Sequence, residues 1–75
     1  MEEESWIDES ITINFSIPSI LQEIVDSCEQ HNRERDYRYF DDVDDMWVWA
    51  KNLCVSGKIT KKQWETLELR YMSRM

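Results

Sequence analysis

Residues 41–57 read DDVDDMWVWAKNLCVSG, and this stretch decides the fold class because it specifies a long helix from its start to its stop. Its four aspartates suit a helix start, where the positive end of the helix dipole stabilises acidic side chains. Apolar side chains follow at helical spacing, and Gly57 is a natural stop because glycine enters the left-handed conformation without strain. The predicted buried stripe consists of Val43, Met46, Trp47, Ala50, Leu53 and Cys54.

An earlier helix is predicted over about residues 19–32. Pro18 presets the backbone angle of a helix entry, and Ser19 followed by Gln22 matches the capping-box pattern. Apolar residues then recur at helical spacing, with acidic residues on the opposite side.

A last helix is predicted after Thr60. Thr60 and Gln63 form a second capping-box pattern, and Ile59 and Trp64 occupy the positions of a hydrophobic staple. This helix and the one before Gly57 are expected to form a short antiparallel hairpin.

The stretch 11–17 alternates strictly between apolar and polar residues, which predicts a strand with one buried face. A lone strand cannot satisfy its backbone groups, so it needs a partner. Three partners stay open: residues 37–40 as a brief second strand, a second copy of the chain, or the sheet edge of a target. The predicted fold class is mainly α with a small β element, namely one strand followed by three helices. Residues 11–75 form a single small domain, preceded by an acidic terminus over residues 1–10 that is frayed or loosely docked.

Charge is divided unevenly along the chain. Residues 1–50 carry fourteen acidic and three basic side chains, a balance of −11, whereas residues 51–75 carry six basic and two acidic ones, a balance of +4. The total is the net charge of −7. A body this acidic repels phosphate backbones and anionic membranes, so we expect neither nucleic acid nor membrane as a direct partner. No apolar run is long enough to span a membrane, which indicates a soluble, cytoplasmic protein.

Catalytic and metal-binding motifs are weak in this sequence. Consecutive aspartates on a helix, Asp41 to Asp45, cannot wrap a cation as a glycine-bearing calcium loop does. Cys28 and His31 have the spacing of half a zinc site, but no second pair faces them. No serine or cysteine lies in an activating motif, and one glycine cannot build a phosphate loop. We therefore expect no enzyme, no metal and no cofactor.

Recognition residues are predicted in the window 34–49, where carboxylates and aromatic side chains alternate. Trp49 is two residues from Trp47, so it lies about 200° around the helix and should be exposed if Trp47 is buried. Exposed tryptophan is typical of interface anchors. A solvated charged face is the alternative reading of the same aspartates. The candidate partner-binding residues are Tyr37, Tyr39, Asp41, Asp42, Asp44, Asp45 and Trp49.

The segments Ala50–Leu53 and Ser56–Trp64 resemble the SHOCT domain, a short C-terminal oligomerisation hairpin with a leucine-bearing helix, a Gly-x-Ile-Thr turn and an aromatic in the capped helix. The likeness covers residues 47–72, about a third of the chain. It departs at Lys61 and Lys62, where the family is rich in glutamate. The resemblance implies association rather than catalysis.

These observations predict a small acidic regulator or inhibitor that presents an acidic and aromatic face to a protein with a basic surface. A partner that handles nucleic acid fits this charge, and small acidic inhibitors of phages and mobile elements, including DNA mimics, offer a class analogy. The alternative is a self-associating assembly module, a possible homodimer, that uses the strand or the C-terminal helical hairpin.

Overall fold

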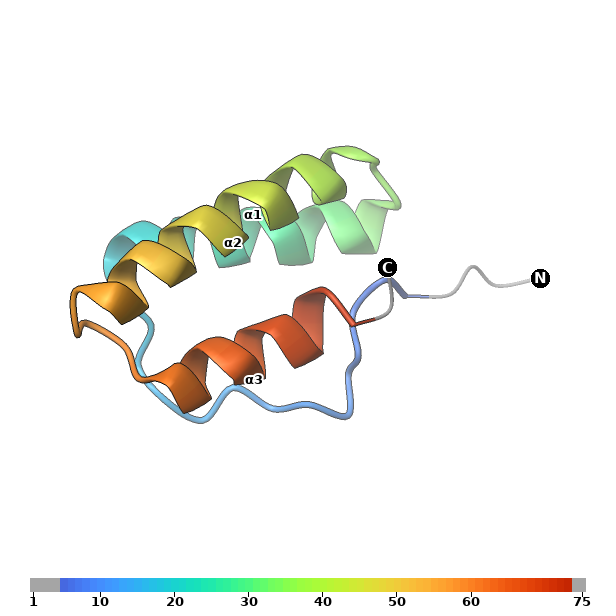
Figure 1. Ribbon diagram of the computed structural model, residues 1–75. Helices are drawn as coiled ribbons and strands as arrows, with labels where there is room; N and C mark the ends of the chain where they lie inside the picture. The colour runs from blue at the N-terminus through green and yellow to red at the C-terminus, as the bar shows by residue number, and fades with distance from the viewer. Residues whose placement is uncertain (1–4, 74–75) are drawn as a thin grey trace.

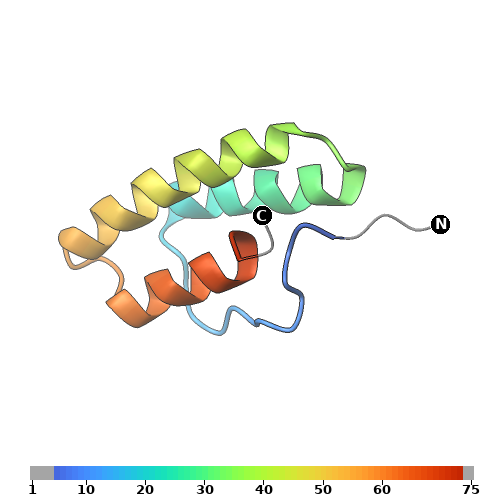
Figure 2. The ribbon, with the colours of Figure 1, turned by 45° about the vertical axis from the view of Figure 1, so that its right-hand side comes forward.

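The protein folds into three helices, and its computed structural model describes residues 5–73. The helices are α1 (Ser19–Glu34), α2 (Arg38–Val55) and α3 (Lys61–Tyr71). Helices α1 and α2 lie side by side and antiparallel, and α3 runs back along α2 (Figure 1). The segment before α1 passes along α3, from the carboxyl end of α3 toward its amino end, as the turned view also shows (Figure 2). The mainly helical class with three helices is therefore confirmed.

The predicted strand over residues 11–17 is not confirmed, because no strand occurs within residues 5–73. The alternation nevertheless reports the right faces: Thr12, Asn14 and Ser16 are exposed, and the apolar residues between them are partly buried. A strand also needs a hydrogen-bonded neighbour, and the proposed partner segment 37–40 lies at the start of α2 instead. A side chain satisfies one backbone group of this segment, since Arg70 Nη1 donates to the Ile11 carbonyl oxygen at 2.7 Å.

The two capping boxes have different outcomes. At α3 the box is present as predicted: the Gln63 amide donates to Thr60 Oγ1 at 3.0 Å, and the Thr60 amide donates to Gln63 Oε1 at 2.9 Å. At α1 the prediction is wrong, because Ser19 is already helical and the cap residue is Pro18, which has no side-chain acceptor. Gln22 instead donates to Asp26 Oδ1 at 2.7 Å.

A residue in the left-handed conformation follows both α1 and α2. Gly57 has a φ of 82°, the left-handed conformation predicted for it, and follows the end of α2 at Val55. Helix α1 ends at Glu34, and the residue that caps it is Arg35, which is not a glycine but has a φ of 54°. The Arg35 amide donates to the Asn32 carbonyl oxygen at 3.2 Å. Because no glycine marks the end of this helix in the sequence, the helix was predicted to end at about residue 32, two residues before its actual end.

Residues 5–10 are docked rather than frayed. Ile7 is buried, with 1% of its surface exposed, and the Trp6 amide donates to Asn32 Oδ1 at 2.8 Å. Tyr39 Oη donates to the Tyr71 carbonyl oxygen at 2.6 Å and lies 3.3 Å from that of Trp6. These bonds join the amino-terminal segment to α1 and α2, and the Tyr39 hydroxyl links it to the end of α3. Residues 1–4, the remainder of the predicted frayed terminus, lie outside the described residues.

The core occupies one line of α2 and the faces of α1 and α3 that meet it. Its buried apolar residues are Ile7, Leu21, Val25, Cys28, Tyr39, Val43, Met46, Ala50, Ile59, Leu67 and Tyr71. Trp47 was predicted to join them, but 43% of its surface is exposed. The buried stripe of α2 is narrower than predicted, because the short helix α3 does not cover the side of α2 next to that stripe. Trp47 lies on that flank and meets Trp64 edge-on, with ring centroids 6.4 Å apart.

Candidate functional site

The candidate site is the side of α2 opposite its core line, which we call the outward face. On this helix Tyr39, Val43, Met46 and Ala50 point inward and are buried. Side chains half a turn away point to solvent. The outward face consists of Asp41, Asp44, Asp45, Val48, Lys51, Asn52 and Val55, all of which are exposed. Exposed Tyr37 immediately precedes the helix, and exposed Trp49 borders the face beside Asp45.

Three carboxylates of the outward face are exposed and unpaired. Within residues 5–73, Asp41, Asp44 and Asp45 have neither an ion pair nor a side-chain hydrogen bond. Because α2 begins at Arg38, only Asp41 lies in the first turn and gains from the helix dipole. Asp41 and Asp45 are four residues apart, and such like-charge pairs destabilise a helix by about 0.2–0.5 kcal/mol. Helix formation therefore does not account for the three carboxylates together.

Asp42 is separated from the other aspartates and turned toward α1. His31 Nδ1 lies 2.5 Å from Asp42 Oδ2, and Ser27 Oγ donates to the same oxygen at 3.0 Å. These contacts tie the carboxyl half of α1 to the amino half of α2. Asp42 is thus committed inside the fold, unlike the three outward aspartates.

Tyr39 cannot contact a partner, which corrects its prediction as a binding residue. Its side chain is fully buried, and its hydroxyl is held by the Tyr71 carbonyl oxygen. Burial raises the pKa of Tyr39 well above its usual value, so the phenol stays a hydrogen-bond donor. A brief strand over 37–40 was one open possibility, and on a strand both tyrosines would face one side. On a helix they diverge, and Tyr37 is 78% exposed.

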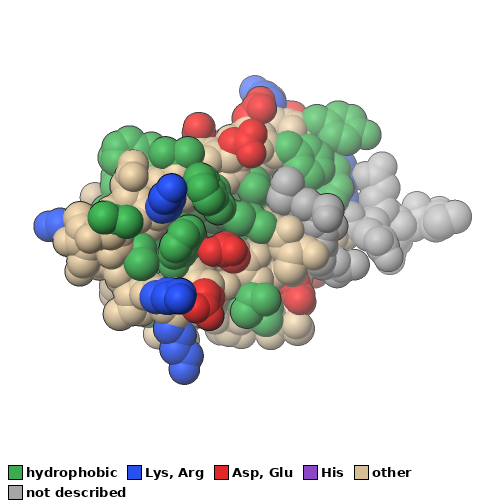
Figure 3. Space-filling model, viewed as in Figure 1, with side chains coloured by type: hydrophobic (Ala, Val, Ile, Leu, Met, Phe, Trp, Pro, Cys, Tyr) green, Lys and Arg blue, Asp and Glu red, His purple; other side chains and the backbone are tan. Residues whose placement is uncertain are grey.

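Large apolar side chains follow the aspartates along α2. Trp47, Val48 and Trp49 are 43%, 48% and 41% exposed, so Trp49 is exposed as predicted and Trp47 is equally so. Lys51 Nζ lies 5.1 Å from the Trp47 ring centroid, a cation–π distance. On the surface of this side of the molecule, apolar side chains are interspersed with basic and acidic ones (Figure 3). The structure therefore brings acidic, aromatic and basic groups onto one helix.

Ser27, His31 and Asp42 are residue types of a hydrolytic triad, but their geometry differs from one. In a triad the histidine links the hydroxyl to the carboxylate, one group at each ring nitrogen. Here Ser27 donates to the carboxylate, and its oxygen lies 3.5 Å from the same nitrogen, His31 Nδ1, that Asp42 occupies. The histidine is not placed to activate the serine. Nearby Cys28 is buried, and burial raises the pKa of its thiol to about 12, which disfavours the nucleophilic thiolate.

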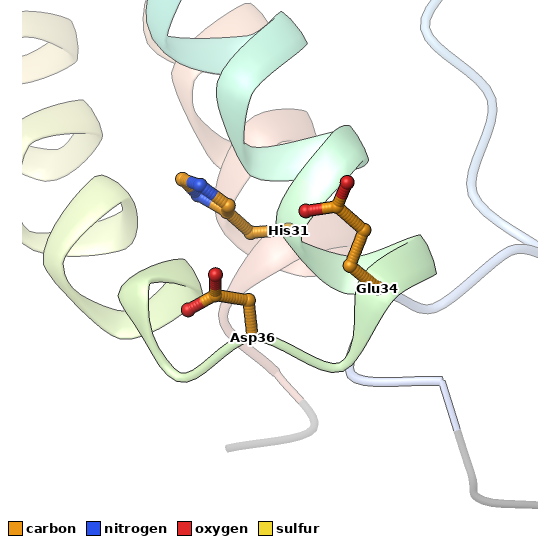
Figure 4. A group of neighbouring side chains, drawn as sticks. All are labelled: His31, Glu34 and Asp36. Carbon is orange, nitrogen blue, oxygen red and sulfur yellow. The ribbon is translucent and has the colours of Figure 1, made fainter.

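A second cluster, His31, Glu34 and Asp36, brings three potential metal ligands within 4.8 Å of one another. They extend from the end of α1 and the turn before α2 (Figure 4). All three residues already have partners, since His31 contacts Asp42, Glu34 accepts from Gln30 and Asp36 pairs with Arg38. Arg38 donates to Asp36 Oδ2 from Nε at 3.0 Å and from Nη2 at 2.6 Å, and these bonds lower the pKa of Asp36 to about 2. A cation here competes with the Arg38 guanidinium, so this cluster is a poor metal site.

Long-range polar contacts fix the opposite side of the molecule. Glu29 Oε2 accepts from Arg70 Nη2 at 3.0 Å and from Tyr71 Oη at 2.6 Å. They wall an open groove of about 460 Å³ between the segment 11–17 and helices α1 and α3. The groove contains the apolar face that was predicted for the strand. No pattern in the sequence signals these contacts, since their partners are about forty residues apart.

Val48, Lys51 and Val55 are the candidate residues that sequence reasoning missed. They were available as a pattern, since 41, 44, 48, 51 and 55 repeat at alternating steps of three and four. That spacing marks one side of a helix. A search for apolar stripes does not reveal this spacing, because Asp41, Asp44 and Lys51 are charged.

No helix in the described part of the chain combines the length and apolar character needed to cross a bilayer. No family model, no curated protein and no solved structure matches the chain.

Proposed function

We propose that this protein is a small, acidic, non-enzymatic regulator or inhibitor that binds another protein through the outward face of α2. The partner would carry a basic surface, in keeping with a protein that handles nucleic acid, and both would be cytoplasmic. The mimicry of DNA by a phage or mobile-element protein is the narrower form of this proposal, and it rests on the acidic charge and the class analogy.

The single observation that carries the proposal is the set of unpaired carboxylates at Asp41, Asp44 and Asp45 beside half-exposed tryptophan. Carboxylates on an outward helix face speed association with basic surfaces and select for them. Aromatic anchors next to them supply the buried area that gives an interface its affinity. Trp49 and Tyr37 provide these anchors at the two ends of the aspartates. Asp42 and Tyr39, which the fold uses internally, drop out of the binding set.

The alternative in which the predicted strand mediates self-association has less support. Ile13, Phe15 and Ile17 are already partly buried against their own chain, which leaves only their groove side to a second copy. The segment 11–17 also lacks the strand conformation that this association would use.

The proposal is tested by affinity capture with matched variants. One variant carries Asp→Asn changes at positions 41, 44 and 45. The control carries Glu→Gln changes at the exposed residues Glu9, Glu23 and Glu65. Each set removes three negative charges, which takes the net charge from −7 to −4.

We expect the wild-type chain and the control to retain the same basic protein from the native host, and the outward-face variant to lose it. Raised salt should release the captured protein because surface charges are screened. Retention of that protein by the outward-face variant, or equal loss by both variants, would contradict the proposal.

A further inference from the structure

We infer that the outward face of α2 also binds a second copy of this chain, as an antiparallel, two-fold symmetric helix pair centred on Val48. This inference goes beyond the proposed function and does not depend on it. The juxtaposition that carries it is a line of five exposed residues, Asp41, Asp44, Val48, Lys51 and Val55, at the spacing of a helix-pairing seam.

The first argument is the apolar content of this line. Val48 is 48% exposed and Val55 is 81% exposed, and the two are seven residues apart, so they lie on the same side of α2. Trp47 borders Val48 and is 43% exposed. A cluster of large apolar side chains on the outside of a helix is unusual for an isolated small protein, and it marks an association surface.

The second argument is charge complementarity, which selects the occupant. The outward face is acidic in its amino-terminal half, at Asp41, Asp44 and Asp45, and basic at Lys51 in its carboxyl-terminal half. A face with opposite charges on either side of its centre is complementary to itself only when the second helix runs in the opposite direction. Closed two-fold symmetry is also the commonest arrangement of homo-oligomers.

The geometry of the pair can be derived from helix dimensions. With a rise of about 1.5 Å per residue, Asp44 lies about 6 Å from Val48 along the helix and Lys51 lies about 4.5 Å on the other side. The two-fold axis brings Lys51 of the second copy to within about 1.5 Å of the level of Asp44. The two side chains are seven residues apart on one helix, so they lie on the same flank and meet across the axis. Two equivalent Asp44–Lys51 pairs therefore flank a Val48–Val48 contact.

Helix α3 does not obstruct this arrangement. It lies beside the Trp47 flank, where Trp64 contacts Trp47, and it leaves the line from Asp41 to Val55 exposed. Lys51 now lies over the Trp47 ring, on the flank that Asp44 of the second copy would approach. The dimer would cover the carboxylates that a basic partner needs, so the two complexes compete for one face.

A charge swap tests the inference in the full chain. Asp44→Lys and Lys51→Asp each place two like-charge pairs across the axis, and each should weaken dimerisation about tenfold in sedimentation equilibrium. The double variant restores opposite charges and keeps the net charge at −7, so it should dimerise as the wild type does. Glu23→Lys and Lys58→Glu change exposed charges elsewhere by the same amounts and should leave the dimer unchanged.

Cysteine cross-linking tests the antiparallel direction, in chains that carry Cys54→Ala. Val48→Cys should form an intermolecular disulfide, because the two copies of residue 48 meet at the axis. Val55→Cys should not, since its two copies lie about 21 Å apart along the helices. Cross-linking of both positions would indicate a parallel pair and overturn the inference.

Two further outcomes would also overturn it. One is a wild-type chain that stays monomeric at millimolar concentration, and such a chain could still capture a basic protein, which would leave the proposed function intact. The other is a swap variant that dimerises no better than the single variants, because the Asp44–Lys51 pairing would then be absent.

Discussion

The residues of the inward and outward faces of α2 recur at the same helical spacing, but the inward ones are buried and the outward ones are exposed. Inward, Tyr39, Val43, Met46 and Ala50 follow one another by steps of four, three and four and are buried by α1, α3 and the amino-terminal segment. Outward, Asp41, Asp44, Val48, Lys51 and Val55 follow by steps of three and four, and no other part of residues 5–73 buries them. The inward face serves the fold, and we propose that the exposed outward face serves association. Under this proposal, stability and recognition reside on opposite sides of one helix.

The largest expected effect is loss of an inward side chain. Met46→Ala should destabilise the fold by about 2–5 kcal/mol, because it removes buried methylene groups and leaves a cavity. Val48→Ala, two residues away on the outward face, should change the free energy of unfolding by less than about 0.5 kcal/mol. Urea denaturation at low micromolar concentration measures both. Equal losses would erase the proposed difference between the faces.

A smaller effect is expected from the two tyrosines at the start of α2. Tyr39→Phe removes the hydroxyl that donates to the Tyr71 carbonyl oxygen, and it should cost about 1–2 kcal/mol because that buried acceptor loses its partner. Tyr37→Phe is the matched control, since Tyr37 is 78% exposed and should be close to neutral for folding. If Tyr37→Phe proved the more damaging change, the assignment of inward and outward tyrosines would be wrong.

The helix starts offer a third pair of substitutions. Thr60→Ala should cost about 1 kcal/mol, because the capping hydroxyl accepts from the Gln63 amide. Ser19→Ala should alter stability by only a few tenths of a kcal/mol, since Ser19 caps nothing and alanine is a better helix former. Thermal melts of the two variants measure this. A large loss for Ser19→Ala would mean that its hydroxyl has a role that the fold does not require.

The smallest effect is expected from divalent metal ions. Asp36 is held by Arg38 and His31 by Asp42, so Zn²⁺ or Mg²⁺ at 1 mM should raise the melting temperature by less than about 1 °C. His31→Ala, which removes one of the three potential ligands, should respond to the ions as the wild type does. A rise of several degrees that His31→Ala abolishes would reveal a metal centre at this end of the molecule.

Features that depend on neighbouring residues could be predicted from the sequence, whereas burial by distant parts of the chain could not. The capping box at Thr60 and the left-handed Gly57 depend on residues within one turn, and both are confirmed. Trp47 was misplaced because its burial depends on how much of α2 the short helix α3 covers. The burial of Tyr39 could not be predicted, because its hydrogen-bond partner, the Tyr71 carbonyl oxygen, is 32 residues away.

The candidate site shows the same division. The exposure of Asp41, Asp44, Asp45 and Trp49 follows from helical spacing around an apolar line. The withdrawal of Asp42 toward His31 could not be predicted, because it requires the register between α1 and α2. The docking of the amino-terminal segment could not be predicted for a similar reason: the residues that contact Trp6 and Ile7 lie on distant helices.

We propose that recognition resides on the outward face of α2, whereas the inward face serves the fold. Hydroxyl-radical footprinting, read out by mass spectrometry, tests it directly by comparing the dilute chain with the concentrated chain or with a captured basic partner. We expect the oxidation of Trp47 and Val48 to fall on association, and the oxidation of Trp6 and of residues 11–17 to stay at its dilute level. Protection of residues 11–17 with Trp47 and Val48 unchanged would contradict it.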